Sequence, residues 1–288
     1  MAWGAAVVVL PWLGVKYAPV AAVLAVLGLV RLYRERSVPA ALVAVGSLVV
    51  AGVAYLVTHR ALYGGWTVYA AGDHFGGDEL TVMGHEPNYP GRSQRLVGLL
   101  LDRGFGLAAW MPGYLLAVPA LAVVVRRRPP GWASVTLPLA AGWATATWVA
   151  LTMHGWWWPG RQTVVVLPCV VLAVAWWVGQ VPAVRPALWV AGALGAATWL
   201  WLVVEVLRER VTLIVDFETT TNPLYRAWRS VLPDYRDPGP DDWLLHGVWL
   251  GVLALVVVAA VLRRPPDPTR SSVPATSVTT RGESHATT

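Results

Sequence analysis

The chain has 288 residues, of which 56% are hydrophobic and only 13% are charged, and its mean hydropathy is +0.54. Soluble domains carry about 25% charged residues and are less than half apolar, so this composition excludes a water-soluble domain of this size. The net charge of +6 comes from short arginine clusters beside apolar segments, a pattern that favours orientation in a membrane over nucleic-acid binding.

Seven apolar segments approach the length of a membrane helix, which needs about 20 apolar residues to cross the ~30 Å hydrocarbon layer. We predict helical spans at about 15–32 (or from 17), 38–57, 107–125, 135–153, 163–178, 187–204 and 243–262. Strict alternation of apolar and polar residues is absent, so a membrane barrel is rejected. The predicted fold is all-α, a polytopic integral membrane helix bundle.

Two long polar connections, at about 61–106 and 205–242, separate these spans. The short links carry arginine clusters, at 31–36, 126–128 and 263–264, and such clusters favour the cytoplasmic side. We therefore predict a multi-pass plasma-membrane protein whose long connections are extracytoplasmic. The membrane domain covers residues 1–264, and residues 265–288, rich in Pro, Ser and Thr, form a disordered cytoplasmic tail.

The N-terminal residues 1–12 are apolar but have no positive region and no cleavage site typical of a signal peptide. The predicted orientation would place this end outside the cell. The segment is typical of the end of an earlier helix, and the simplest explanation is that a preceding N-terminal portion is missing. The alternative is a natural protein with a short external N-terminus.

Two shorter helices are predicted within the polar connections. Residues 95–102 place Leu96, Leu99 and Leu100 on one face, which is typical of a helix lying at the membrane interface. In the second connection, Asn222 followed by Pro223 has the residue types of a helix N-cap and first turn.

The first long connection also holds the candidate catalytic carboxylates Asp73, Asp78 and Glu79. Carboxylates can act as a general base or bind a divalent cation such as Mg²⁺ or Mn²⁺. Their spacing matches no metal-binding motif, and Cys169 is the only cysteine, so no metal site is assigned. The alternative is a solvated loop with ordinary surface charge.

Basic residues near the ends of the spans are candidates for contacts with a lipid phosphate. Arg103 and Arg161 carry guanidinium groups, which match phosphate oxygens with paired hydrogen bonds. Lys16 begins the first span and is either a phosphate contact or an interfacial anchor. The link from His154 to Arg161 contains three tryptophans, which are typical of a membrane interface.

Three phrases in chain order resemble those of polytopic bacterial glycosyltransferases of the GT-C superfamily. The phrase LPWLGVKYAP at 10–19 resembles their LPW-x-x-x-(K/R)-Y. The phrases LLDRGFGL at 100–107 and WMPGYL at 110–115 resemble their LLFD-x-x-(F/Y)-GL and Y-x-P-x-Y-L. Residues 155–161, followed by 164–168, are similar to their GG-W-x-PP-G-R and V-x-P-L-L.

The resemblance covers residues 10–172 and corresponds to the C-terminal half of these enzymes. They transfer a sugar from a polyprenyl-phosphate donor to an acceptor at the outer membrane face, and their catalytic acid lies in an outer loop near the N-terminus. The resemblance thus implies a polyprenyl-phosphate sugar and membrane lipid as partners. We assign substrate or lipid-phosphate binding to five residues: Lys16, Asp102, Arg103, His154 and Arg161.

Two other functions stay open on the sequence. The first is a non-catalytic membrane scaffold or a subunit for cell-envelope assembly. The second is a transporter, which is less favoured because charged residues are nearly absent within the predicted spans.

Overall fold

Helices are the regular elements of this chain. The computed structural model describes residues 2–71, 87–155, 158–212 and 217–263, and these residues form helices and no strand. The all-α fold expected from the sequence is thereby confirmed for the described part of the chain.

Four helical segments are long and apolar enough to cross a membrane: Val15–Arg34, Val38–Ala70, Pro182–Leu207 and Pro240–Leu262. They contain the long helices α2 (Ala18–Arg34), α3 (Val38–Tyr63), α10 (Arg185–Leu207) and α12 (Pro240–Leu262). Helices of this length and composition support the assignment to the integral membrane proteins.

The remaining helices are shorter. They are α1 (Ala2–Leu13), η1 (Val15–Tyr17), η2 (Val68–Ala71), α4 (Tyr89–Arg92), α5 (Arg95–Leu101), α6 (Leu107–Trp110), η4 (Pro112–Leu116), α7 (Ala117–Arg127), α8 (Trp132–Ala144), η5 (Thr145–Val149), η6 (Val164–Val166), α9 (Leu167–Gln180), η7 (Pro182–Val184), η8 (Phe217–Thr219) and α11 (Pro223–Arg229).

Four of the predicted spans contain more than one helical element, and two of them are η1–α2 at 15–32 and η6–α9 at 163–178. Over 107–125 the chain forms α6, η4 and α7 in succession, with Pro112 at the first break. Proline lacks the amide hydrogen that helix continuation requires, which explains this break. Over 135–153, α8 passes into the π-helical stretch η5, where the amide of Ala150 bonds to the carbonyl of Thr145 at 2.9 Å.

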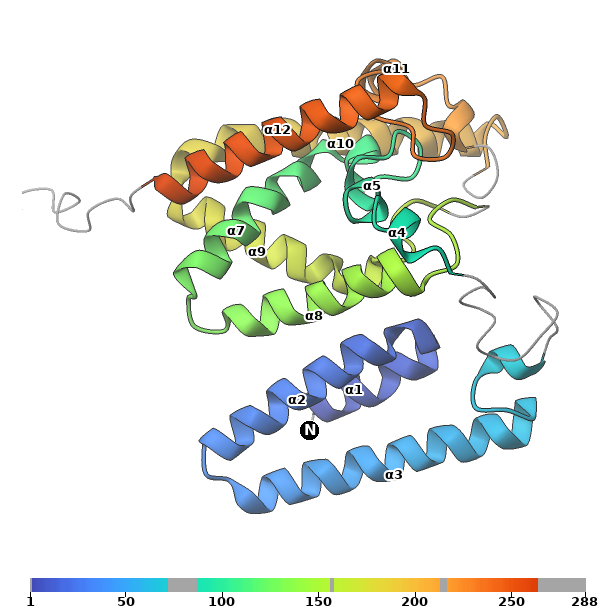
Figure 1. Cartoon of the computed structure of the whole chain (residues 1–288), viewed down its shortest axis with the longest axis vertical. Helices are drawn as coiled ribbons and strands as arrows, with labels where there is room; N and C mark the ends of the chain where they lie inside the picture. The colour runs from blue at the N-terminus through green and yellow to red at the C-terminus, as the bar shows by residue number, and fades with distance from the viewer. Residues whose placement is uncertain (1, 72–86, 156–157, 213–216, 264–288) are drawn as a thin grey trace, which may run out of the picture.

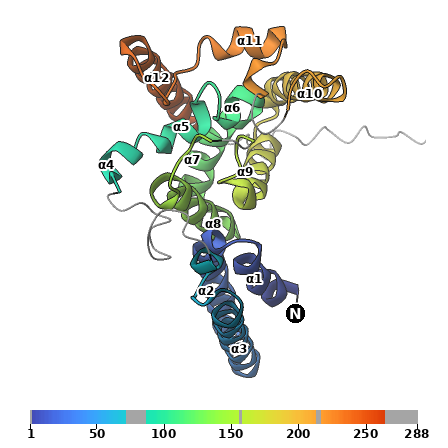
Figure 2. The same cartoon turned by 90° about the vertical axis from the view of Figure 1, so that its right-hand side faces the viewer.

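The bundle is arranged as a stack of roughly aligned helices (Figure 1). Helices α7, α8 and α9 pack together in the middle. On one side α12 packs against α7, and on the other side α2 packs against α8 and is followed outward by α3 (Figure 2). The buried core of the middle layer contains Val123, Val166 and Ala173.

One end of the bundle collects the short links. The turns after α2 and after α7 lie there together with the end of α12 (Figure 1). The guanidinium of Arg127 donates to the carbonyl of Arg263 at 3.0 Å, which joins two of these links. Helices α4, α5 and α11 lie at the opposite end, so the described parts of both polar connections share it.

Helix α3 shows most clearly how the surface is adapted to lipid. It begins after Ser37 with a proline in its first turn, and it ends at Gly64, whose φ of 75° closes the helix in the left-handed region. Its sole buried residue is His59. An apolar surface this extensive is covered by lipid or protein in functional molecules.

Candidate functional site

The carboxylate of Asp102 organises the polar end of the bundle. Asp102 follows α5 and is only 2% exposed. Its Oδ1 accepts hydrogen bonds from the amides of Gly104 at 2.9 Å and Phe105 at 2.6 Å. Its Oδ2 accepts from the amide of Tyr235 at 3.0 Å. Asp102 therefore shapes the turn that leads into α6 and ties the first polar connection to the second.

The imidazole of His154 completes the shell around this carboxylate. Its Nε2 lies 3.1 Å from Oδ2 of Asp102, and the edge of Phe105 packs against the ring at 5.1 Å. Burial alone would raise the pKa of Asp102, but the hydrogen bond and charge of His154 and the amides of Phe105 and Tyr235 outweigh it. The pKa of Asp102 therefore lies below its ordinary value. An ionised carboxylate only accepts, so Nε2 of His154 donates to Asp102.

The side chain of Arg103 turns towards the second polar connection. Its guanidinium forms an ion pair with Asp242, and its Nε donates to the carbonyl of Leu232 at 3.2 Å. The hydroxyl of Tyr225 donates to the carbonyl of Arg103 at 3.1 Å. The charge of Arg103 is thus balanced within the protein, and its contact with a lipid phosphate stays a prediction.

Two further arginines of the first connection cap the helix that ends nearby. Arg92 donates to the carbonyl of Trp148 at 2.7 Å. Arg95 donates to the carbonyls of Ala150 at 2.7 Å and Leu151 at 3.0 Å. The last carbonyls of a helix have no partners within the helix, so these guanidinium groups stabilise the end of η5.

Glu218 joins the polar group from the second connection and was not singled out by the sequence. A Cβ placed on Gly104 would lie 2.7 Å from Oε1 of Glu218, so the carboxylate rests against the turn that Asp102 shapes. Arg229 approaches Oε2 at 3.9 Å. Burial raises the pKa of Glu218, Arg229 opposes this, and the negative charge of Asp102 adds to it, so that the pKa lies above its ordinary value. No spacing in the sequence signals this contact between distant segments.

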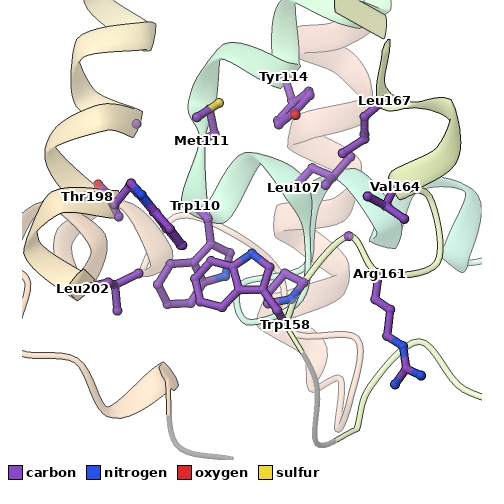
Figure 3. Close-up of a pocket in the computed structure, with 14 residues that line it drawn as sticks. Leu107, Trp110, Met111, Tyr114, Trp158, Arg161, Val164, Leu167, Thr198 and Leu202 are labelled. Carbon is purple, nitrogen blue, oxygen red and sulfur yellow. The ribbon is translucent and has the colours of Figure 1, made fainter. Parts of the chain in front are cut away.

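An apolar cavity of about 440 Å³ lies beside this polar group. Figure 3 shows Trp110 and Trp158 side by side at one wall and Arg161 at the rim, its side chain pointing away from these rings. The cavity is lined by α6, η4, α10 and the chain before α9, with the residues Leu107, Trp110, Met111, Tyr114, Trp158, Pro159, Gly160, Arg161, Val164, Leu167, Gly195, Thr198, Trp199 and Leu202.

An aromatic wall separates the cavity from the polar group. The ring of Phe217 contacts Phe105, Trp110 and Trp158, with centroids 5.4–5.5 Å apart. Trp110 stacks on Tyr225 at 4.0 Å. These rings bury a large apolar area in edge and stacked geometries, so they form a well-packed wall of the cavity.

Lys16 contacts the backbone of Arg161, which lines the cavity at its rim. The Nζ of Lys16 donates to the carbonyl of Arg161 at 3.2 Å and to Oε1 of Gln162 at 3.3 Å. The two positive charges repel each other. An anion bound here would be attracted by both, so this rim suits a phosphate.

The structure thus brings together four of the five predicted binding residues in two pairs: Asp102 with His154, and Lys16 with Arg161. Arg103 lies next to the first pair. The predicted catalytic residues Asp73, Asp78 and Glu79 lie outside the described residues. In the described ranges, no group of three His, Cys, Asp or Glu side chains could hold a metal, and binding of Mg²⁺ or Mn²⁺ stays a prediction.

Three features make up the candidate site. The geometry consists of an apolar cavity, a cationic rim and a neighbouring cluster of ionisable groups. Comparisons with protein-family models, with curated proteins and with solved structures identify no match for the chain.

Proposed function

We propose that the chain is a membrane glycosyltransferase-like protein, or the C-terminal portion of one, that binds a polyprenyl-phosphate sugar for transfer to a cell-envelope acceptor. One observation carries the proposal. Two of the three phrases that resemble the GT-C superfamily line one cavity, and the first phrase contacts its rim. The second phrase supplies Trp110 and Tyr114 to the lining and the third supplies Trp158 and Arg161, while Lys16 of the first donates to the carbonyl of Arg161.

The shape and charge of this region suit an amphiphile with a phosphate group. The cavity of about 440 Å³ is apolar and is lined by four aromatic side chains, and its volume lies in the ~300–1,000 Å³ range of ligand pockets. A prenyl chain would enter the cavity, and the phosphate would lie between Lys16 and Arg161. The sugar would then have to pass around the edge of the aromatic wall to reach His154 and Glu218, where proton transfer to or from an acceptor hydroxyl is chemically feasible.

The proposal includes seven membrane crossings. The four long helical segments would supply four, and the broken segments α6–η4–α7, α8–η5 and η6–α9 would supply three. The end that holds the arginine-bearing turns would face the cytoplasm, and the end that holds α4, α5 and α11 would face outward, in line with the positive-inside tendency.

A second candidate function, a non-catalytic scaffold or subunit for cell-envelope assembly, is favoured by a different observation. Asp102 accepts hydrogen bonds from three backbone amides and from His154, and Arg103 is paired with Asp242. Buried polar groups satisfied in this way also occur where their role is to fix a structure. The two functions differ in whether a sugar is transferred from a bound polyprenyl-phosphate donor.

Binding of a polyprenyl phosphate by the purified full chain tests the proposal. We expect Lys16→Gln and Arg161→Gln each to weaken binding about tenfold, because a hydrogen bond to a charged group contributes about 1.5 kcal/mol or more. Arg60→Gln, at the same end of the bundle but on α3, is the matched control and should bind normally. Equal binding by all three variants would contradict the assigned phosphate site.

Transfer of a labelled sugar from a polyprenyl-phosphate donor then separates the enzyme from the scaffold. The enzyme is supported if the chain binds the donor and transfers its sugar, and if Arg161→Gln abolishes the transfer. Donor binding without turnover, in membranes that also contain any upstream portion encoded next to this chain, favours the scaffold or subunit.

Labelling with a membrane-impermeant thiol reagent tests the topology. Cys169→Ser removes the only cysteine, so single cysteines can be introduced in that background. Glu35→Cys, in the turn after α2, should be labelled only after cells are opened. Ser230→Cys, after α11, should be labelled in intact cells. Both residues are exposed, and labelling from the same side would contradict the proposed orientation.

A further inference from the structure

A second apolar groove runs between α7 and α8, on the other side of η4 from the cavity described above. Its volume is about 670 Å³. Leu107 and Tyr114 line both spaces, so these two side chains form the partition between them. The other residues that line the groove are Leu96, Leu100, Ala117, Val118, Leu121, Val125, Trp132, Thr136, Leu137, Leu139, Ala140, Trp143, Ala144, Trp148 and Val170.

The groove has the chemistry of a hydrocarbon chain and runs along most of the depth of the bilayer. Trp132 and Trp148 both line it and lie 16 positions apart on the continuous α8–η5 segment, which is about 24 Å at ~1.5 Å per residue. This is most of the ~30 Å hydrocarbon layer. The groove walls include the exposed side chains Val125 and Leu137, so the groove is accessible from the lipid-facing surface.

The charges at one end of the groove indicate the headgroup. Arg126 and Arg128 are exposed at the end of α7, and the guanidinium of Arg128 lies 5.3 Å above the ring of Trp132, which lines the groove. The sequence contains no Asp or Glu between Asp102 and Glu205, so no acidic residue of α7, α8 or α9 balances these charges. Arginine pairs well with phosphate oxygens.

The opposite end of the groove is different. There the guanidinium groups of Arg92 and Arg95 donate to the carbonyls of Trp148 and Ala150. Their donors are directed at the backbone of η5 instead of into the bilayer surface. The charge distribution therefore favours a headgroup at the arginine-bearing end.

We propose that this groove binds one acyl chain of an anionic phospholipid, whose phosphate is held by Arg126 and Arg128. This site is separate from the polyprenyl-phosphate cavity, and it stands whether or not the chain transfers a sugar. Because the occupant packs between α7 and α8, it would support the wall formed by Leu107 and Tyr114 from the side opposite the cavity.

Photolabelling of the full chain tests the proposal. The chain is reconstituted in nanodiscs of phosphatidylcholine that contain a trace of phosphatidylglycerol with a photoreactive acyl chain, and labelled peptides are mapped by mass spectrometry. We expect labels on α7 and α8 to exceed those on α3 at least fivefold. A photoreactive phosphatidylcholine should show no such preference, because it carries no net negative charge.

Two pairs of variants locate the acyl chain and the headgroup of the bound lipid. Ala140→Trp fills the groove and should abolish the excess labelling, whereas Ala54→Trp adds the same bulk to the exposed surface of α3 and should leave it intact. Arg126→Gln with Arg128→Gln should reduce it at least fivefold. Arg34→Gln with Arg36→Gln, at the same end and with the same left-handed backbone at the second arginine, should not.

The proposal would be overturned by equal labelling of α3 and of α7 and α8, or by excess labelling that Ala140→Trp leaves unchanged. Equal labelling by the two lipids, or an unchanged signal in the Arg126 and Arg128 double variant, would overturn the anionic headgroup. Circular dichroism and size-exclusion profiles of each variant establish that it is folded. If Ala140→Trp fails to fold, Leu137→Trp replaces it, because this substitution fills the same groove from an exposed position.

Discussion

The Nε2 of His154 lies 3.1 Å from Oδ2 of Asp102, and the two residues come from polar segments 52 positions apart in the chain. This contact fixes the link before the cavity to the turn after α5. Because Asp102 also accepts from the amide of Tyr235, three separate segments converge on one carboxylate. The stability of the polar end therefore depends on Asp102.

Replacing Asp102 by Asn should destabilise the protein by about 2–4 kcal/mol at neutral pH, because an amide places donors opposite buried donors. The sign of the pH dependence follows from the lowered pKa. The stabilisation is present above the ordinary pKa of an aspartate and is lost as the pH falls through the lower native value. Unfolding in detergent from neutral to acid pH measures both effects.

The exposed Asp237→Asn variant serves as the control for this experiment. It should unfold as the unmodified protein does, with the same loss of stability in acid. An Asp102→Asn variant that retains the full acid-induced loss would show that another carboxylate is responsible.

Glu218 should have the opposite pH dependence, because its pKa is raised by burial and by the charge of Asp102 against the opposing effect of Arg229. The folded state holds the proton more tightly than the unfolded state does. Its contribution to stability is present below the ordinary pKa and is lost as the pH rises through the native pKa. Glu218→Gln should flatten this part of the curve, whereas Glu209→Gln, at an exposed position, should leave it unchanged.

Arg103 and Asp242 should show an energetic coupling across the two polar connections. Their side chains are 30% and 14% exposed, so we expect a coupling of about 1 kcal/mol in a double-mutant cycle with Arg103→Gln and Asp242→Asn. The exposed pair Arg31 and Glu35 on one helix turn is the control and should show no measurable coupling. Additive effects of the two substitutions would show that the ion pair does not hold the connections together.

Gly142 marks a close contact between α8 and η6, the short helix before α9. A Cβ at this position would lie 2.5 Å from Cγ1 of Val166, which is fully buried. Gly142→Ala should therefore cost about 1–3 kcal/mol through overpacking, and Val166→Ala in the same chain should recover part of it. Gly46→Ala on α3, where no atom lies within 4 Å, should cost nothing. Thermal unfolding of the three variants measures these changes in stability. An equal loss of stability in Gly142→Ala and Gly46→Ala would show that the contact between Gly142 and Val166 is unimportant.

The long helices could be predicted from the sequence because apolar composition over about 20 residues is a direct consequence of the bilayer. The segments at 38–57, 187–204 and 243–262 all lie within helices, and only the helix ends extend further. The predicted N-cap at Asn222 is confirmed, since its side chain accepts from the amides of Leu224 and Tyr225. These are local effects of composition and capping.

The breaks within spans could not be predicted from the sequence, because one proline among apolar residues permits both a kink and a full interruption of a helix. Over 107–125 the helix is interrupted. Likewise, α5 (Arg95–Leu101) was expected at the interface, but Leu99, Leu100 and Leu101 are buried against the polar end. Amphipathic spacing predicts that a helix has an apolar face, but the partner of that face depends on the tertiary packing.

The sequence predicted which residues belong to the site. It did not predict which of these residues contact one another. Lys16 and Arg161 are 145 positions apart, and no periodicity connects them. Glu218 was missed because the approach of its carboxylate to Gly104 depends on two connections folding onto each other. Contacts of this kind follow from the topology and leave no local pattern in the sequence.

The π-helical stretch η5 sets the direction of the carbonyls at the end of the α8–η5 segment. The bond from the amide of Ala150 to the carbonyl of Thr145 spans one residue more than an α-helical bond. Removing one residue here would restore α-helical geometry and rotate the following backbone by about 100°. The carbonyls of Trp148 and Ala150 would then turn away from the guanidinium groups of Arg92 and Arg95, so a single surplus position keeps this end of the segment aligned with its two caps.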